Sequence, residues 1–204
     1  INLKVAAADL LTIAQMPDVV WVGENFPPRL LDEKQNQVLA ANFNSGKTGP
    51  AAPGYRSWLD GLGFSQNPND YPIVSVVDDG VGDGTTASGA GDPTLTLLGQ
   101  GGVSRVVFAE NCTNDSSADG RAGHGHINSS IIAGFDERNG FPFKDADGYL
   151  RGLGVNPYGR VGNTKFFNNG GSAVLCGGSY QNMIRSEQLN GALISLGHLT
   201  GKPS

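Results

Sequence analysis

Alternating apolar and polar stretches divide the first 60 residues into short predicted elements. Leu10, Leu11 and Ile13 lie at helical spacing in a stretch without internal Gly or Pro. The predicted elements are a helix over residues 5–16, a β-prone run at 19–22, a helix over 29–42 and a short helix at 55–59. Pro27-Pro28 and the Gly/Pro-rich residues 43–54 separate them. Within residues 1–24, the helix followed by the β-prone run fits an α+β element, but too little of it is present to close a core.

The pattern changes at residue 71. Ile73–Val77 is a nearly continuous apolar run, which is typical of a parallel strand covered on both faces. Further strands are predicted at residues 103–109 and 164–167, and helices at 122–135 and 179–196. The order strand, strand, helix, strand, helix indicates an open α/β sheet. In such a sheet, functional residues gather at the carboxyl ends of strands and the amino ends of helices.

Composition and charge narrow the classes of protein to consider. The 204 residues include 31 Gly and 11 Pro, and only 16% are charged, against about 25% in an average domain. The net charge is −5 and the 14 Lys and Arg residues are scattered, which excludes a basic nucleic-acid or membrane surface. The apolar runs are far shorter than the roughly 18 residues of a membrane span. The sequence therefore predicts a loop-rich globular protein without nucleic-acid or membrane partners.

Two short segments carry candidate chemistry. The first is Asp78-Asp79-Gly80, an acid placed where a buried strand stops and a glycine allows a tight turn. The second is Gly123-His124-Gly125-His126, an imidazole at a predicted helix start. The positive end of the helix dipole is expected to keep the imidazole neutral, as a general base requires. Taken singly, each segment is also explained as an ordinary turn or a helix cap.

Together, in this order, the two segments resemble the signatures of the subtilisin-like serine proteases. An apolar strand running into Asp-x-Gly corresponds to residues 74–80, and the Gly-His-Gly-Thr-His-Val-Ala-Gly-like signature corresponds to residues 123–134. The resemblance implies that Asp78 and His124 are the catalytic acid and base of the triad. Asp79 departs from the usual Ser or Thr, and His126 stands where Thr is usual, so His126 is not the catalytic candidate.

The resemblance also implies a fold and a domain division. It predicts a truncated subtilisin-like open parallel sheet flanked by helices, preceded by a partial ferredoxin-like propeptide element. We expect the end of a propeptide-like segment at residues 1–26 and an incomplete catalytic domain at residues 27–204. The family's Gly-Thr-Ser-x-Ala-x-Pro motif does not occur, and Ser172, Ser179, Ser186 and Ser195 lack its context.

The function expected from the resemblance is that of a serine-type endopeptidase. Its substrate would be a peptide or protein, its location extracellular, and a further partner the missing carboxy-terminal half of the domain. The present chain alone is expected to be inactive because it lacks the nucleophile. Catalysis would need no cofactor. The family often binds structural calcium, but Asp145-Ala146-Asp147-Gly148 is read more simply as a polar turn.

Two other classes of function stay open. One is a non-catalytic protein that keeps the same scaffold for binding. The other is a metal-binding α/β domain that uses His124 and His126, although residues two apart do not share a helical face.

The two cysteines, Cys112 and Cys176, form either one disulfide or none. Asn111, Asn114 and Asn128 each begin an Asn-x-Ser/Thr glycosylation sequon.

Overall fold

The computed structural model of this chain describes residues 5–19, 22 and 32–197. The chain divides into two compact units, Ile1–Leu30 and Leu31–Ser204. In the first unit, a 3-10 helix over Ala7–Asp9 leads into the short helix α1 over Leu10–Ala14, and none of their residues is buried. Most of the predicted strand at residues 19–22 and the predicted domain boundary at residues 26 and 27 lie outside the described residues.

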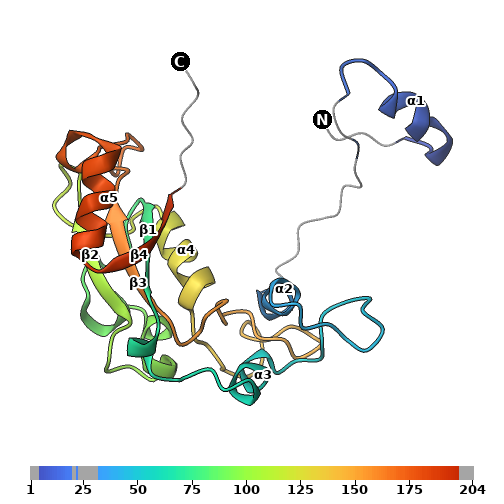
Figure 1. The fold of residues 1–204 in the computed structure, drawn as a ribbon, viewed down its shortest axis with the longest axis horizontal. Helices are drawn as coiled ribbons and strands as arrows, with labels where there is room; N and C mark the ends of the chain where they lie inside the picture. The colour runs from blue at the N-terminus through green and yellow to red at the C-terminus, as the bar shows by residue number, and fades with distance from the viewer. Residues whose placement is uncertain (1–4, 20–21, 23–31, 198–204) are drawn as a thin grey trace. The chain divides into compact units, whose positions relative to one another are not determined.

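The second unit is built on a parallel four-stranded sheet with the order β2-β3-β1-β4 (Figure 1). The strands are β1 Ile73–Asp78, β2 Val106–Asn111, β3 Arg160–Lys165 and β4 Ala192–Gly197. Helix α4 (His124–Ala133) covers one face, and helix α5 (Tyr180–Leu189) covers the other. The predicted α/β class, with an open parallel sheet flanked by helices, is therefore confirmed.

The central strand β1 is buried on both faces because helices cover each side of the sheet. Val77 packs with Phe166 and with Met183 of α5. On the opposite face, Val161 of β3 packs with Ala133 of α4. The apolar run that predicted this strand is thus explained, and the strand ends at Asp78.

Two other predicted strands exist but are shifted along the chain. The strand predicted at residues 103–109 is β2, which begins at Val106, and the one predicted at 164–167 is β3, which ends at Lys165. The helix predicted at 122–135 is α4, shorter by two residues at each end.

The long helix predicted over residues 179–196 is wrong in its second half. Helix α5 ends at Leu189, and residues 192–197 form strand β4, which pairs in parallel with β1. Gly191 separates the two elements with a φ of +89°, a left-handed conformation that a helix cannot continue through. The apolar residues at 192–196 satisfy helical spacing and strand burial alike, so the pattern alone does not decide between them.

Buried Arg105 holds the carboxyl end of α4. Its side chain is wholly buried, and its guanidinium donates to the carbonyl oxygens of Thr96, Gly159 and Thr94 at 2.8 Å and of Ala133 at 2.5 Å. Burial lowers the pKa of Arg105 to about 10. Ala133 is the last residue of α4, where a positive charge also complements the helix dipole. The helix is therefore fixed at the end opposite to His124.

A second core lies between helices α2 (Asp32–Leu39) and α3 (Tyr55–Gly61) and the loop that follows α4. Buried Glu33 accepts hydrogen bonds from the main-chain nitrogens of Gly54 (2.5 Å), Tyr55 (2.7 Å) and Leu150 (2.7 Å). Its carboxylate therefore caps the start of α3. The apolar residues of this core are Tyr55, Leu59, Phe135, Leu150, Leu153 and Tyr158. The helix predicted at 55–59 is confirmed, and that at 29–42 is confirmed for Asp32–Leu39, its first three residues lying outside the described part.

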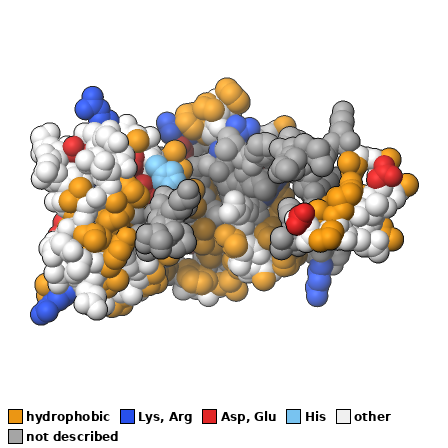
Figure 2. All heavy atoms as spheres, turned by 90° about the horizontal axis from the view of Figure 1, so that it is seen from above, with side chains coloured by type: hydrophobic (Ala, Val, Ile, Leu, Met, Phe, Trp, Pro, Cys, Tyr) orange, Lys and Arg blue, Asp and Glu red, His pale blue; other side chains and the backbone are white. Residues whose placement is uncertain are grey.

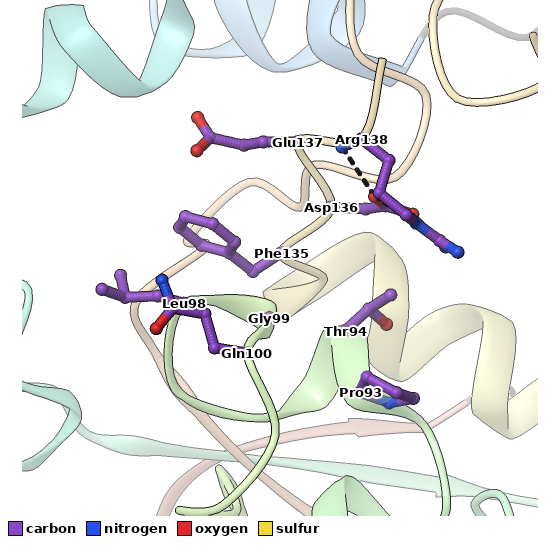
Figure 3. Close-up of a pocket in the computed structure, with 9 residues that line it drawn as sticks. All are labelled: Pro93, Thr94, Leu98, Gly99, Gln100, Phe135, Asp136, Glu137 and Arg138. Atoms are coloured by element: carbon purple, nitrogen blue, oxygen red, sulfur yellow. Dashed lines mark hydrogen bonds and ion pairs between the residues drawn. The ribbon is translucent and has the colours of Figure 1, made fainter. Parts of the chain in front are cut away.

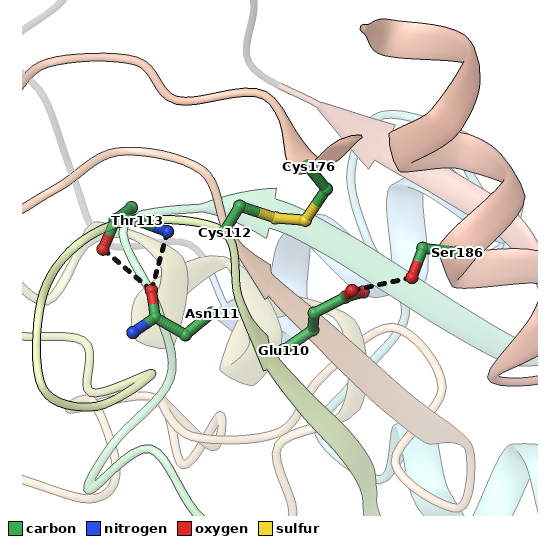
Figure 4. Close-up of a disulfide and its surroundings, with 6 residues drawn as sticks. All are labelled: Glu110, Asn111, Cys112, Thr113, Cys176 and Ser186. Carbon is green, nitrogen blue, oxygen red and sulfur yellow. Dashed lines mark hydrogen bonds between the residues drawn. A yellow bond between two sulfur atoms is a disulfide. The ribbon is translucent and has the colours of Figure 1, made fainter. Parts of the chain in front are cut away.

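A disulfide joins Cys112, which follows β2, to Cys176, the first residue of a 3-10 helix over Cys176–Gly178 (Figure 4). Close to it, the Ser186 hydroxyl of α5 donates to the Glu110 carboxylate of β2 at 2.7 Å. These two links attach α5 to the sheet through β2.

The surface agrees with the low charge of the sequence. On the face drawn in Figure 2, the side chains coloured as charged are few among the described residues. Among the residues described, no helix has the length and apolar character that a membrane crossing requires.

Candidate active site

The structure brings the two predicted site residues into contact. Asp78 is the last residue of β1 and His124 is the first residue of α4. Nδ1 of His124 lies 2.7 Å from Oδ2 and 2.9 Å from Oδ1 of Asp78. The Asp78 carboxylate is buried, whereas 56% of the His124 side chain is exposed. A buried carboxylate thus supports an imidazole that faces solvent.

Glycines allow the start of α4 to pack directly on the end of β1. A Cβ on Gly125 would lie 2.4 Å from the Gly80 carbonyl oxygen and 2.9 Å from Cβ of Asp78. Gly80 has a φ of +111°, and a Cβ there would lie 2.3 Å from the carbonyl oxygen of Asp119. At both glycines the main chain lies too close to neighbouring atoms for a side chain to fit.

Asp79 caps helix α4 from the neighbouring turn. The helix begins after Gly123, which offers no side chain for capping. Oδ1 of Asp79 accepts from the Gly125 main-chain nitrogen at 2.6 Å, and Oδ2 accepts from that of His124 at 3.3 Å. These are two of the amide groups that a helix start leaves without internal partners. The carboxylate that departs from the resemblance therefore fixes the residue that carries the imidazole.

Asn128, which begins a glycosylation sequon, is a further side chain at Asp78. Its Nδ2 donates to Oδ2 of Asp78 at 3.0 Å and lies 3.3 Å from Nδ1 of His124. The available signal was its position four residues after His124, because residues i and i+4 share one face of a helix.

The Asp78 carboxylate raises the pKa of His124. The pKa of His124 is raised above its ordinary value, first by its hydrogen bond to Asp78 and then by the charge of that carboxylate, with a smaller contribution from Asp79. The expectation that the helix start keeps this ring neutral left out these two carboxylates, which raise the pKa of the imidazole. With Nδ1–H donated to Asp78, Nε2 is the basic nitrogen of the neutral ring.

His126 pairs with a different carboxylate, that of Asp92. Its Nε2 lies 2.9 Å from Oδ2 of Asp92, in the loop that packs against α4. Burial alone would raise the pKa of Asp92, but the hydrogen bonds from His126 and Thr94 together lower it. Within the described part of the chain, no group of three or more His, Cys, Asp and Glu side chains is arranged to hold a metal ion.

The turn at residues 145–148 is occupied by an ammonium group. Nζ of Lys34 lies 2.6 Å from Oδ2 of Asp145 and 3.0 Å from Oδ2 of Asp147. The pKa of Asp145 is lowered, first by its hydrogen bond to Lys34. The two carboxylates of this turn therefore link it to Lys34 of α2.

Three of the serines considered from the sequence have other partners. Ser179 caps α5 by accepting from the Asn182 main-chain nitrogen, Ser186 donates to Glu110, and Ser195 donates to Glu187. The structure therefore assigns these hydroxyls to helix capping and to the packing of α5 on the sheet.

A cavity of about 390 Å³ opens at the far end of α4 (Figure 3). Leu98 and Phe135 form part of its wall, and Asp136 and Arg138 form another part. The guanidinium of Arg138 forms an ion pair with the Asp136 carboxylate at 2.5 Å, so each charge is neutralised by the other. Asp78 and His124 are not among the residues that line this cavity.

Neither a scan against models of protein families nor a search of curated proteins finds a match to this chain.

Proposed function

We propose that this chain supplies the acid and base of a subtilisin-like serine endopeptidase that cuts peptide or protein substrates. The observation that carries the proposal is the contact of 2.7 Å between Nδ1 of His124 and the buried Asp78 carboxylate. This is the arrangement in which a carboxylate fixes the tautomer of a catalytic imidazole. The sequence contains no serine in the family's motif, so the nucleophile comes from outside these 204 residues.

In the proposed reaction, Nε2 of His124 accepts the hydroxyl proton of the serine while the serine oxygen bonds to the substrate carbonyl carbon. The same proton then passes to the amine nitrogen as the carbon–nitrogen bond breaks. His124 then deprotonates a water molecule whose oxygen bonds to the acyl carbon. The bond between that carbon and the serine oxygen breaks, the carboxylic acid leaves, and His124 returns the proton to the serine oxygen. Asp78 stays ionised throughout and stabilises the imidazolium that forms twice in each cycle. Because the base must be neutral, activity is expected to increase with pH through the raised pKa of His124.

The domain division and the location implied by the resemblance are also part of this proposal. They are a propeptide-like segment at residues 1–26, an incomplete subtilisin-like catalytic domain at 27–204, and an extracellular location. The disulfide between Cys112 and Cys176 supports the last of these, because such bonds persist in oxidising compartments.

The test begins with a fluorophosphonate probe, which labels the activated serine of serine hydrolases. We expect no labelling of residues 1–204 alone. The coding sequence beyond residue 204 is then read for the Gly-Thr-Ser-x-Ala motif, and the longer protein is expressed and labelled. Asp78→Asn should slow its labelling on the order of 10⁴-fold, because the imidazole loses its fixed tautomer. His124→Ala should abolish labelling.

His126→Ala is the matched control, since its imidazole pairs with Asp92 and not with Asp78. It should label within a few-fold of the parent protein. Two results would overturn the proposal: a longer reading frame without the serine motif, which favours a binding scaffold, or undiminished labelling of the His124→Ala protein. Labelling of the 204-residue chain would refute the expected lack of a nucleophile.

A further inference from the structure

The buried Asp78 carboxylate accepts hydrogen bonds from three different groups. Oδ1 accepts from the Asp79 main-chain nitrogen at 2.8 Å, and Oδ1 and Oδ2 both lie within reach of Nδ1 of His124. Oδ2 also accepts from Nδ2 of Asn128 at 3.0 Å. Asp78 is only 3% exposed, so these groups replace the water that would otherwise solvate its charge.

The donors at Oδ2 differ in a way that matters chemically. His124 titrates, and in the proposed reaction its charge changes in every cycle. The amide of Asn128 does not titrate, so it donates to Oδ2 whatever the state of the ring. The opposite amide orientation would direct a carbonyl oxygen at the carboxylate, which the negative charge disfavours.

Helix α4 supplies both donors from one face. His124 and Asn128 are four residues apart, and their nitrogens Nδ1 and Nδ2 lie 3.3 Å from each other. Both nitrogens therefore converge on the same carboxylate oxygen from adjacent turns. Because one helix carries both residues, the amide and the imidazole share the negative charge of this oxygen.

We propose that Asn128 is a positioning residue of this site, acting through Asp78: its amide donates to Oδ2 and takes up part of that oxygen's charge, so that the carboxylate attracts the imidazolium less strongly. The role of Asn128 in catalysis rests on the proposed function, but its effect on the pKa of His124 does not. Without the amide, the less solvated carboxylate would attract the imidazolium more strongly. Removing Asn128 should therefore raise the pKa of His124 further.

The other charged groups around the ring stay constant in this comparison. Asp79 follows β1 and caps α4. Lys165, at the end of β3, is neutralised by Asp115 and Asp119. His126 on α4 pairs with Asp92 from the facing loop. A change in the titration of His124 on substitution of Asn128 is thus attributable to the amide itself.

The experiment is an NMR titration of the histidine Cε1–H signals in the 204-residue chain, assigned with His124→Ala and His126→Ala. Asn128→Leu, which keeps the size of the side chain but removes the donor, should raise the pKa of His124 by about half a unit or more. Asn128→Asp adds a carboxylate and should raise it further. Asn128→Gln keeps an amide donor and should recover most of the parent value.

Asn182→Leu is the matched control, because that amide donates to the Gly177 carbonyl oxygen in front of α5. It should leave the His124 titration unchanged. A pKa of His124 that is unchanged or lowered in Asn128→Leu would overturn the proposal. If that variant does not fold, the other two variants provide the test. A pKa of His124 that is not raised in Asn128→Asp, or not close to the parent value in Asn128→Gln, would then overturn the proposal. The titration needs no serine and no substrate, so its result is independent of whether peptidase activity is found.

Discussion

At the residue scale, wholly buried Lys165 fixes the loop that leads into the candidate site. Its ammonium lies 2.9 Å from Oδ1 of Asp119 and 3.1 Å from Oδ2 of Asp115, and it donates to Oδ1 of Asn169 at 3.0 Å. Burial by itself would lower the pKa of Lys165, but the hydrogen bonds to both carboxylates raise it overall. The loop between β2 and α4 is therefore attached to the end of β3, beside β1.

This cluster predicts a specific loss of stability in acid. The pKa of Asp119 is lowered, first by its hydrogen bond to Lys165. Burial would raise the pKa of Asp115, but its hydrogen bonds lower it overall. The stabilisation is therefore complete above the ordinary Asp pKa of about 3.9 and is lost as the pH falls through the lowered values. Lys165→Met should flatten the dependence of Tm on pH between pH 4 and 2, as measured by circular dichroism.

The control for this prediction is Lys47→Met, which changes an exposed lysine in the loop after α2. It should keep the parent's slope of Tm against pH. Equal slopes for the parent and Lys165→Met would show that the cluster does not contribute to acid stability.

Sequence reasoning at this scale found Asp78 and His124 because each lies where an element changes. A buried strand that ends in an acid, and a histidine between glycines, are visible as patterns. The spacing of Asn128 places it on the same helix face as His124, but its hydrogen bond to Asp78 and the cap formed by Asp79 depend on where the amide and the carboxylate lie after the chain has folded. Asn128 in particular matches a glycosylation sequon, a pattern unrelated to its contact with Asp78.

At the element scale, the packing of α4 on β1 depends on Gly125. Gly125→Ala would place a Cβ 2.4 Å from the Gly80 carbonyl oxygen, so the start of α4 must move away from the strand. We expect a loss of roughly 1–3 kcal/mol in the free energy of unfolding, as for other overpacked sites. The pKa of His124 should fall toward its ordinary value, because the ring moves away from Asp78. Urea unfolding and the histidine titration measure the two effects.

Gly61→Ala is the matched control, since nothing lies within 4 Å of a Cβ built at the end of α3. It should leave the His124 titration unchanged and the stability equal or slightly higher. An unaltered titration in Gly125→Ala would contradict the argument that this glycine brings the two residues together.

The elements differ in how far the sequence determines them. Strand β1 was predictable because a buried parallel strand needs an unbroken apolar run. Strand β4 was not, because Leu193, Ile194 and Leu196 fit a helix as well as a strand, and pairing with β1 decides the outcome. The ends of β2 and β3 are set by their pairing register, which becomes fixed only when the sheet forms.

At the scale of the whole molecule, the disulfide closes a loop across much of the second unit. Cys112 and Cys176 are separated by 64 residues. Cross-linking a loop of that length stabilises the folded state by about 4 kcal/mol in the chain-entropy model. The double variant Cys112→Ser/Cys176→Ser should lose a free energy of this order in urea unfolding. Reductant should destabilise the parent similarly and leave the variant unaffected, whereas a loss below about 1 kcal/mol would contradict the prediction.

The sheet order also governs the sequence of events during synthesis. Both neighbours of β1 in the sheet, β3 and β4, come later in the chain. At ~5–20 residues per second, the apolar run Ile73–Val77 leaves the ribosome several seconds before either partner strand exists. Throughout that interval the nascent chain exposes a hydrophobic segment that a chaperone can recognise. The Asp78–His124 contact has no completed sheet to support it until then, so we expect it to form only after β3 and β4 have been made.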